Sequence, residues 1–133
     1  MTQKELDKYI KLQEKFQLRC EAICKILEPL NYNYGYLSDF EIDVYEAKVY
    51  GEGEEYWQYG GYESHSGSFP VSYLCMSDDA IKKIVEDELK RREEAKLEEL
   101  KRRENAEAIL QKKRDREEYE RLKKIFEGGN DED

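Results

Sequence analysis

The sequence predicts an α+β protein with an N-terminal helix, a small antiparallel β-hairpin or three-stranded meander, and a long, charged, coiled-coil-like C-terminal helix. Apolar residues recur every three or four positions over 6–30, and apolar and acidic residues alternate over 40–45. Neither proline nor glycine occurs over 77–127. We therefore expect an α-β-α globular unit over residues 1–95, an extended charged helix over 96–127 and a disordered acidic tail over 128–133.

The N-terminal helix is predicted to begin at a capping box, because Thr2 is followed three positions later by Glu5. Pro29 is expected to end the helix. The apolar positions between them form a seam that needs a partner surface, either the second helix or another copy of the chain. The seam residues, with a single polar interruption at Gln13, are Leu6, Tyr9, Gln13, Phe16, Cys20, Ile23, Leu27 and Leu30.

The middle of the chain is predicted to form the sheet. Residues 31–38 are rich in turn formers and should connect the first helix to a strand, in which Phe40, Ile42 and Val44 face the core and Glu41 and Asp43 face outward. A bulge or a second short strand should follow over 46–50, and the glycine-rich run over 51–55 reads as a turn. Residues 62–73 should form a return strand, which Pro70 confines to an edge or to the strand's end.

The C-terminal helix is predicted to start after a cap at Ser77. Of the 39 side chains over 86–124, 27 are charged, with acid-to-base pairs four residues apart such as Glu98 with Arg102. Its first apolar residues should close the globular unit, and a distal patch is either a dimer contact or a scatter of apolar residues. The first set comprises Ile81, Ile84, Val85 and Leu89, and the distal patch comprises Tyr119, Leu122 and Phe126.

Charge is concentrated in the middle of the chain. The formal net charge is −9, and residues 31–76 hold eight carboxylates against one lysine. Direct binding of nucleic acid by this segment is not expected, because phosphate neutralisation requires the opposite sign. No apolar run is long enough for a membrane span, and three cysteines without a secretory segment predict a soluble intracellular protein without disulfides.

No catalytic or cofactor motif is recognisable, so we expect no enzyme activity and neither cofactor nor metal. A zinc set of two helical cysteines, a third cysteine and the single histidine has the wrong spacing for a zinc knuckle, and thiols on the seam are better explained as core residues. The serines beside the histidine lack a nucleophile elbow. The residues weighed for these alternatives are Cys20, Cys24, Cys75, His65, Ser64, Ser66 and Ser68.

Aromatic residues accompany the acidic residues in the middle segment. Nine of the eleven tyrosines and the single tryptophan lie within 31–76, more than a small core can hide. Exposed tyrosine beside carboxylates is typical of a surface that binds a basic groove of another protein. The candidate partner-binding residues are Glu41, Asp43, Tyr45, Glu46, Tyr50, Glu52, Glu54, Glu55, Tyr56, Trp57, Tyr59 and Tyr62.

The run from Tyr56 to Tyr62 (YWQYGGY), followed by Ser68 to Leu74 (SFPVSYL), resembles a pattern in small uncharacterised proteins of bacteriophages and prophages. In those proteins an acidic, aromatic hairpin with a Phe-Pro-X-X-Tyr-Leu ending precedes a highly charged helix. The resemblance covers about residues 40–100 and carries over no catalytic residue. It implies a small phage-type protein that acts in the cytoplasm of a host bacterium.

Three hypotheses of function follow. The first is a non-enzymatic protein whose acidic, tyrosine-rich hairpin inhibits or sequesters a host nucleic-acid-handling protein with a basic groove, as an anti-CRISPR-like inhibitor does. The second is a homodimeric coiled-coil structural or assembly protein, which the seam favours. The third is a sponge for a nucleotide signal, with bases stacked on tyrosines; the shortage of basic residues weighs against it.

Overall fold

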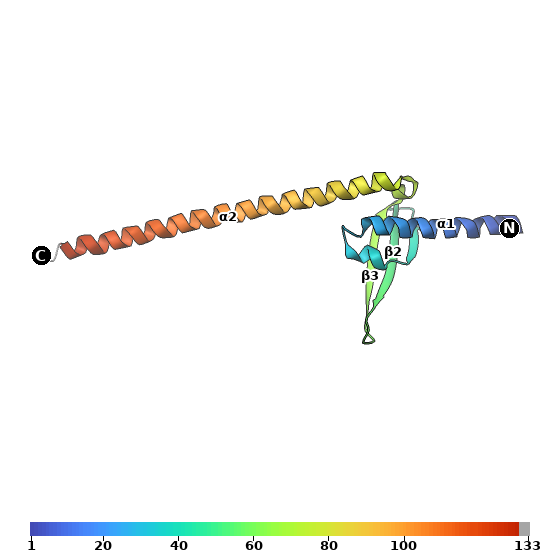
Figure 1. Cartoon of the computed structure of the whole chain (residues 1–133), viewed down its shortest axis with the longest axis horizontal. Coiled ribbons are helices and arrows are strands. Elements are labelled where there is room, and N and C mark those ends of the chain that lie inside the picture. The colour runs from blue at the N-terminus through green and yellow to red at the C-terminus, as the bar shows by residue number, and fades with distance from the viewer. Residues whose placement is uncertain (131–133) are drawn as a thin grey trace. The chain divides into compact units, whose positions relative to one another are not determined.

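One helix, three antiparallel strands and a second, much longer helix follow one another in the computed structural model, which describes residues 1–130 (Figure 1). The sheet has the order β1-β2-β3. The predicted α+β class and the three-stranded meander are thereby confirmed. The elements are α1 (Gln3–Leu27), the 3₁₀ helix η1 (Tyr32–Tyr36), β1 (Asp39–Asp43), β2 (Lys48–Tyr56), β3 (Tyr62–Pro70), the 3₁₀ helix η2 (Val71–Cys75) and α2 (Asp78–Asn130).

Contacts between residues divide the chain into two units. The first, Met1–Lys90, holds α1, the sheet and the first turns of α2, and the second begins at Arg91 and holds the rest of α2. The helix continues through Asn130, which is further than we predicted. Of the predicted acidic tail, residues 131–133 lie outside the described residues.

The helix α1 begins where the sequence predicts. The backbone N–H of Glu5 donates to Oγ1 of Thr2 over 3.2 Å, so Thr2 caps the first turn. The seam is buried only in its second half, where Cys20, Ile23 and Leu27 are at most 2 % exposed. In the first half, Leu6, Tyr9 and Gln13 are exposed, and Phe16 is half-buried at the boundary between the two halves.

Strand pairing gives the sheet two chemically different faces. The face toward the core, here called the inner face, carries Val49 directly opposite Phe69, and both are buried. In Figure 1, α1 crosses this small sheet, and buried residues of α1, β2, β3 and α2 form one core. Phe40 packs against that core from β1.

The prediction that Ile42 and Val44 belong to the core is wrong, because these side chains are 47 % and 82 % exposed. β1 is an edge strand, so Ile42 has a neighbouring strand on one side only. Val44 lies beyond the end of the strand. There Oδ1 of Asp43 accepts the backbone N–H groups of Tyr45 and Glu46 over 2.9 and 3.1 Å and turns the chain toward β2.

We predicted a turn for the glycine-rich run over 51–55, and this prediction is wrong. The run forms the middle of β2. Gly51 and Gly53 lie on the inner face, where η1 packs directly on the strand. A Cβ atom on Gly53 would lie 1.6 Å from the carbonyl oxygen of Tyr36. Glycine inside a strand allows another backbone to approach this closely, and that approach explains the composition of the run.

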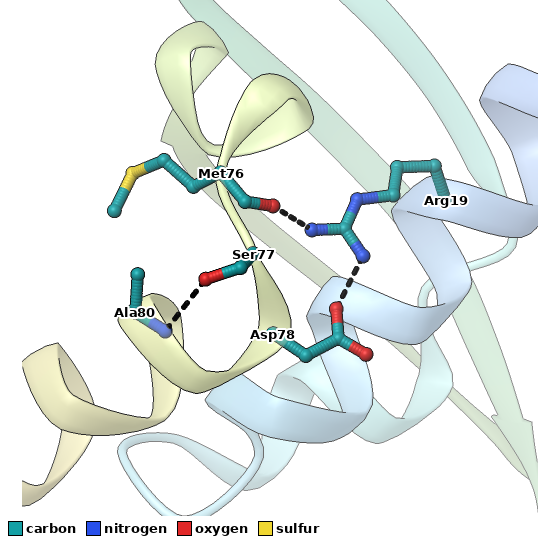
Figure 2. Close-up of polar contacts among 5 residues, drawn as sticks. All are labelled: Arg19, Met76, Ser77, Asp78 and Ala80. Atoms are coloured by element: carbon teal, nitrogen blue, oxygen red, sulfur yellow. Dashed lines mark hydrogen bonds and ion pairs between the residues drawn. The ribbon is translucent and has the colours of Figure 1, made fainter.

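The start of α2 is joined to α1 by Arg19 (Figure 2). The guanidinium donates to the carboxylate of Asp78 and to the carbonyl oxygen of Met76, while Oγ of Ser77 accepts the N–H of Ala80 over 3.2 Å. The predicted cap at Ser77 is thus confirmed. Of the predicted closing residues of α2, Ile81 and Val85 are buried, whereas Ile84 and Leu89 are exposed.

In the second unit, α2 is held by local interactions. Glu98 pairs with Arg102 and Glu99 with Arg103 over 3.3 and 3.0 Å, as the four-residue spacing predicts. These pairs are exposed, so each contributes only about 0.3–0.5 kcal/mol. The distal residues Tyr119, Leu122 and Phe126 are exposed. Among residues 1–130, no helix combines the length and the apolar character needed to cross a membrane.

Replacing Gly53 with alanine should lower the free energy of unfolding by about 3 kcal/mol, because the added methyl group overlaps a backbone oxygen that cannot move without displacing η1. Denaturant unfolding followed by the fluorescence of Trp57 measures this loss. Gly128→Ala is the matched control, since no described atom lies within 4 Å of its added Cβ. Equal stability of the two variants would contradict the close approach of η1.

Asp78→Asn should destabilise the protein at neutral pH and have little effect in acid. The hydrogen bond from Arg19 is the main cause that lowers the pKa of Asp78 in the folded protein. The carboxylate therefore stabilises the fold above its ordinary pKa, and this contribution is lost as the pH falls through the lower folded-state pKa. Thermal melting across this range measures it, with Asp79→Asn as the control in the same helical turn. If the melting temperatures of the wild type and Asp78→Asn differed equally at neutral and acidic pH, the ion pair would be excluded as the source of the destabilisation.

Candidate functional site

The outer face of the sheet, opposite α1 and η1, is acidic and aromatic. Strand alternation places seven large polar side chains there, and all are exposed. The single basic side chain on this face is Lys48, at the start of β2. We call this surface the acidic tyrosine face; it comprises Asp39, Glu41, Tyr50, Glu52, Glu54, Tyr56 and Tyr62.

Register brings like charges together on the acidic tyrosine face. Asp39 lies directly opposite Glu52, and Glu41 lies opposite Tyr50. Carboxylates at opposing positions of neighbouring strands repel one another and destabilise a sheet. An open hollow of about 650 Å³ is lined by Asp39, Glu52 and Glu54 and by Ser64 and Ser66 of β3. The arrangement therefore holds a concentrated negative field on a surface that no described residue covers.

Tyrosine hydroxyls hold two carboxylates in place. Tyr56 donates to Glu54, and Tyr50 donates to Glu46 in the turn between β1 and β2. These hydrogen bonds are the main cause that raises the pKa of both tyrosines. At the far end of the sheet, Tyr56 and Tyr62 face each other across the strands with ring centroids 6.2 Å apart. Of these tyrosines, Tyr56 lines the acidic hollow.

The structure distributes the twelve predicted partner-binding residues over four places. Six lie on the acidic tyrosine face. Asp43 uses its carboxylate to form the first turn and is half-buried, and Glu55 lies on the inner face. In order, the members are Glu41, Tyr50, Glu52, Glu54, Tyr56 and Tyr62 on the face; Asp43, Tyr45 and Glu46 at the β1–β2 turn; Trp57 and Tyr59 at the β2–β3 turn; and Glu55.

A second polar group, the His65 cluster, lies on the inner face. The His65 side chain is 2 % exposed; its Nδ1 lies 2.7 Å from Oδ1 of Asn33, and its Nε2 lies 3.0 Å from Oε2 of Glu55. Its ring stacks on Tyr36 at 4.8 Å and meets the edge of Tyr32 at 5.4 Å. His65 is four residues from Phe69 on β3, and this even spacing could have predicted that His65 lies on the inner face. Its partners could not be predicted, because they are distant in the sequence.

Glu55 accepts several hydrogen bonds in the His65 cluster. The hydrogen bond from His65 is the largest cause that lowers the pKa of Glu55, and the hydrogen bond from Tyr36 is the second largest. The indole of Trp57 also donates to Glu55. Conversely, the hydrogen bond to Glu55 raises the pKa of Tyr36. The single histidine and the single tryptophan of the chain therefore meet at one carboxylate.

The two chemical alternatives weighed from the sequence are not assembled. Cys20 and Cys24 are core residues, and burial raises their thiol pKa values to about 11 and about 12. Within the described part of the chain, cysteine belongs to no group of three metal-ligating side chains. Ser64, Ser66 and Ser68 project from the face of β3 opposite to His65, so His65 cannot activate them.

Comparisons with protein-family models, curated proteins and solved structures give no match to this chain. The arrangement of its own side chains must therefore carry the functional argument.

Proposed function

We propose that this protein is a non-enzymatic, phage-type binding protein whose acidic tyrosine face occupies the basic groove of a host nucleic-acid-handling protein, in the manner of an anti-CRISPR-like inhibitor. The observation that supports it is the exposed array of Asp39, Glu41, Glu52 and Glu54, bordered by tyrosines on one face of a sheet.

Electrostatics favour this class of partner. Alternate residues of a strand lie about 6.6–6.8 Å apart and neighbouring strands about 4.8 Å apart, so the acidic tyrosine face presents carboxylates in two dimensions. A groove lined by lysine and arginine is complementary to such a surface, and the attraction would accelerate association. A nucleic acid, or a nucleotide bound through its phosphates, would instead be repelled.

The tyrosines favour binding to a protein surface. Tyr56 and Tyr62 are 73 % and 62 % exposed, and aromatic side chains of this kind act as anchors in interfaces because they bury a large area with few rotatable bonds. Hydrogen bonds between tyrosine and glutamate fix Glu54 before binding, which reduces the entropy lost when a partner docks.

Reversing two charges on the acidic tyrosine face should abolish binding. We expect immobilised wild-type chain to retain a basic nucleic-acid-binding protein from a nuclease-treated bacterial lysate, and duplex DNA or RNA to elute it. Glu41→Lys with Glu52→Lys should lose this capture. Asp43 is left unchanged because its carboxylate forms the turn.

Glu104→Lys with Glu107→Lys is the matched control, since it changes the net charge equally within the second unit. Circular dichroism checks that all variants fold. Equal capture by the two double variants would show that the acidic tyrosine face is not the binding surface. Retention of proteins that nucleic acid does not elute would contradict the proposed class of partner.

A homodimeric structural or assembly protein is the second candidate function. The first half of the α1 seam is exposed, with Leu6 at 39 % and Tyr9 at 52 %, and Ile10 beside Tyr9 is 45 % exposed. In Figure 1 this half of α1 projects beyond the sheet. A regular apolar stripe on a helix is the surface through which two copies of a helix associate.

Sedimentation velocity at high micromolar concentration tests this candidate. The wild type should sediment as a dimer that Leu6→Lys weakens, because the new charge would lie in the seam. Leu18→Lys is the control on α1, since Leu18 is 66 % exposed and lies outside the seam. A monomeric wild type would exclude the homodimer.

A further inference from the structure

The His65 cluster is continued by a second carboxylate. Glu63 lies directly opposite Glu55 across β2 and β3, and two residues before His65 on the same face of β3. One ligand atom from each of Glu55, Glu63 and His65 lies within 4.8 Å of the other two. His65 is buried, Glu55 is half-buried and Glu63 is exposed, so these atoms lie where the inner face opens to solvent.

We propose that Glu55, Glu63 and His65 bind a divalent first-row transition metal ion, of which Zn²⁺ is the representative. The donor set of one imidazole nitrogen and two carboxylate oxygens suits this class of ion. Three protein ligands leave room for water on the exposed side. This site lies on the inner face and is independent of the partner-binding role proposed for the acidic tyrosine face.

The positions of the two His65 ring nitrogens support the site. Nδ1 lies 2.7 Å from Oδ1 of Asn33, so the tautomer protonated at Nδ1 can donate to this carbonyl oxygen and leaves Nε2 available as a ligand. Nε2 faces a carboxylate oxygen of Glu55 at 3.0 Å. A histidine that donates its other N–H to a protein oxygen has the arrangement usual for metal-bound imidazole.

The distances between the donor atoms are close to those around one ion. Two ligands of a tetrahedral Zn²⁺ ion, each about 2.1 Å from it, lie about 3.4 Å apart. Nε2 of His65 and Oε2 of Glu55 lie 3.0 Å apart, and a carboxylate oxygen of Glu63 lies within 4.8 Å of both residues' ligand atoms. Small shifts of these side chains would therefore place the three donors around one ion.

Charge also favours a divalent ion at this place. Glu55 and Glu63 form a like-charge pair at opposing positions, which destabilises a sheet unless a cation offsets it. The single lysine of the sheet, Lys48, is seven residues from Glu55 along β2, about 23 Å away. A divalent ion carries the two positive charges that balance both carboxylates.

The test uses chain stripped of metal by a chelator, in a Cys75→Ser background because the exposed thiol of Cys75 would compete for zinc. Zinc is titrated while the fluorescence of Trp57 is recorded, since Trp57 is the only tryptophan and its indole donates to Glu55. The ring nitrogens of the only histidine are followed by NMR. We expect saturation at about one equivalent and a shift of the Nε2 signal, with Nδ1 remaining protonated.

Because removing His65 would destabilise the fold, Glu63→Gln is the test variant and Glu54→Gln, on the opposite face, is the control. Glu63→Gln should weaken zinc binding by about tenfold or more, and Glu54→Gln should bind as the wild type does. Equal affinity of the two variants would overturn the proposal. An Nε2 signal unchanged by millimolar zinc would also overturn it.

Discussion

The contact of Tyr36 with Gly53 is the constraint on which the rest of the first unit depends. The Tyr36 carbonyl approaches β2 so closely that only glycine fits there. This approach brings η1 onto the inner face, where Tyr36 stacks on His65 and Leu37 is buried between the glycines of the sheet. Because η1 and α1 occupy the inner face, charged and aromatic side chains remain on the acidic tyrosine face, exposed to solvent.

The two faces of the sheet consequently hold carboxylates in different surroundings. On the acidic tyrosine face, Glu41 and Glu52 are solvated and held in place chiefly by the strands that carry them. On the inner face, Glu55 accepts hydrogen bonds from an imidazole, a phenol and an indole, and its pKa is lowered. The exposed acids are suited to long-range attraction of a basic partner, and the inner acids to short-range coordination of a cation.

Local signals in the sequence were sufficient for the helices and the order of the strands. The caps at Thr2 and Ser77 lie within single turns, and their partners are three residues away. The run around Gly53 was misjudged because glycine favours both a turn and the close approach of a distant backbone, and only the tertiary fold decides between them. On the acidic tyrosine face, strand alternation predicted the outward position of Glu41, whereas Glu52 and Glu54 were expected in a turn and Asp39 was not predicted. The His65 cluster was not predicted either, since Asn33 and His65 are separated by 32 positions and meet only when η1 packs on the sheet.

The central claim is that the acidic tyrosine face and nucleic acid compete for one groove. The most direct measurement is the apparent dissociation constant of a captured host protein for its DNA or RNA, determined at increasing concentrations of this chain. Competition predicts that the constant rises in proportion to the concentration of free chain and does not reach a plateau. An apparent dissociation constant that stays unchanged while the chain saturates the host protein would contradict the account.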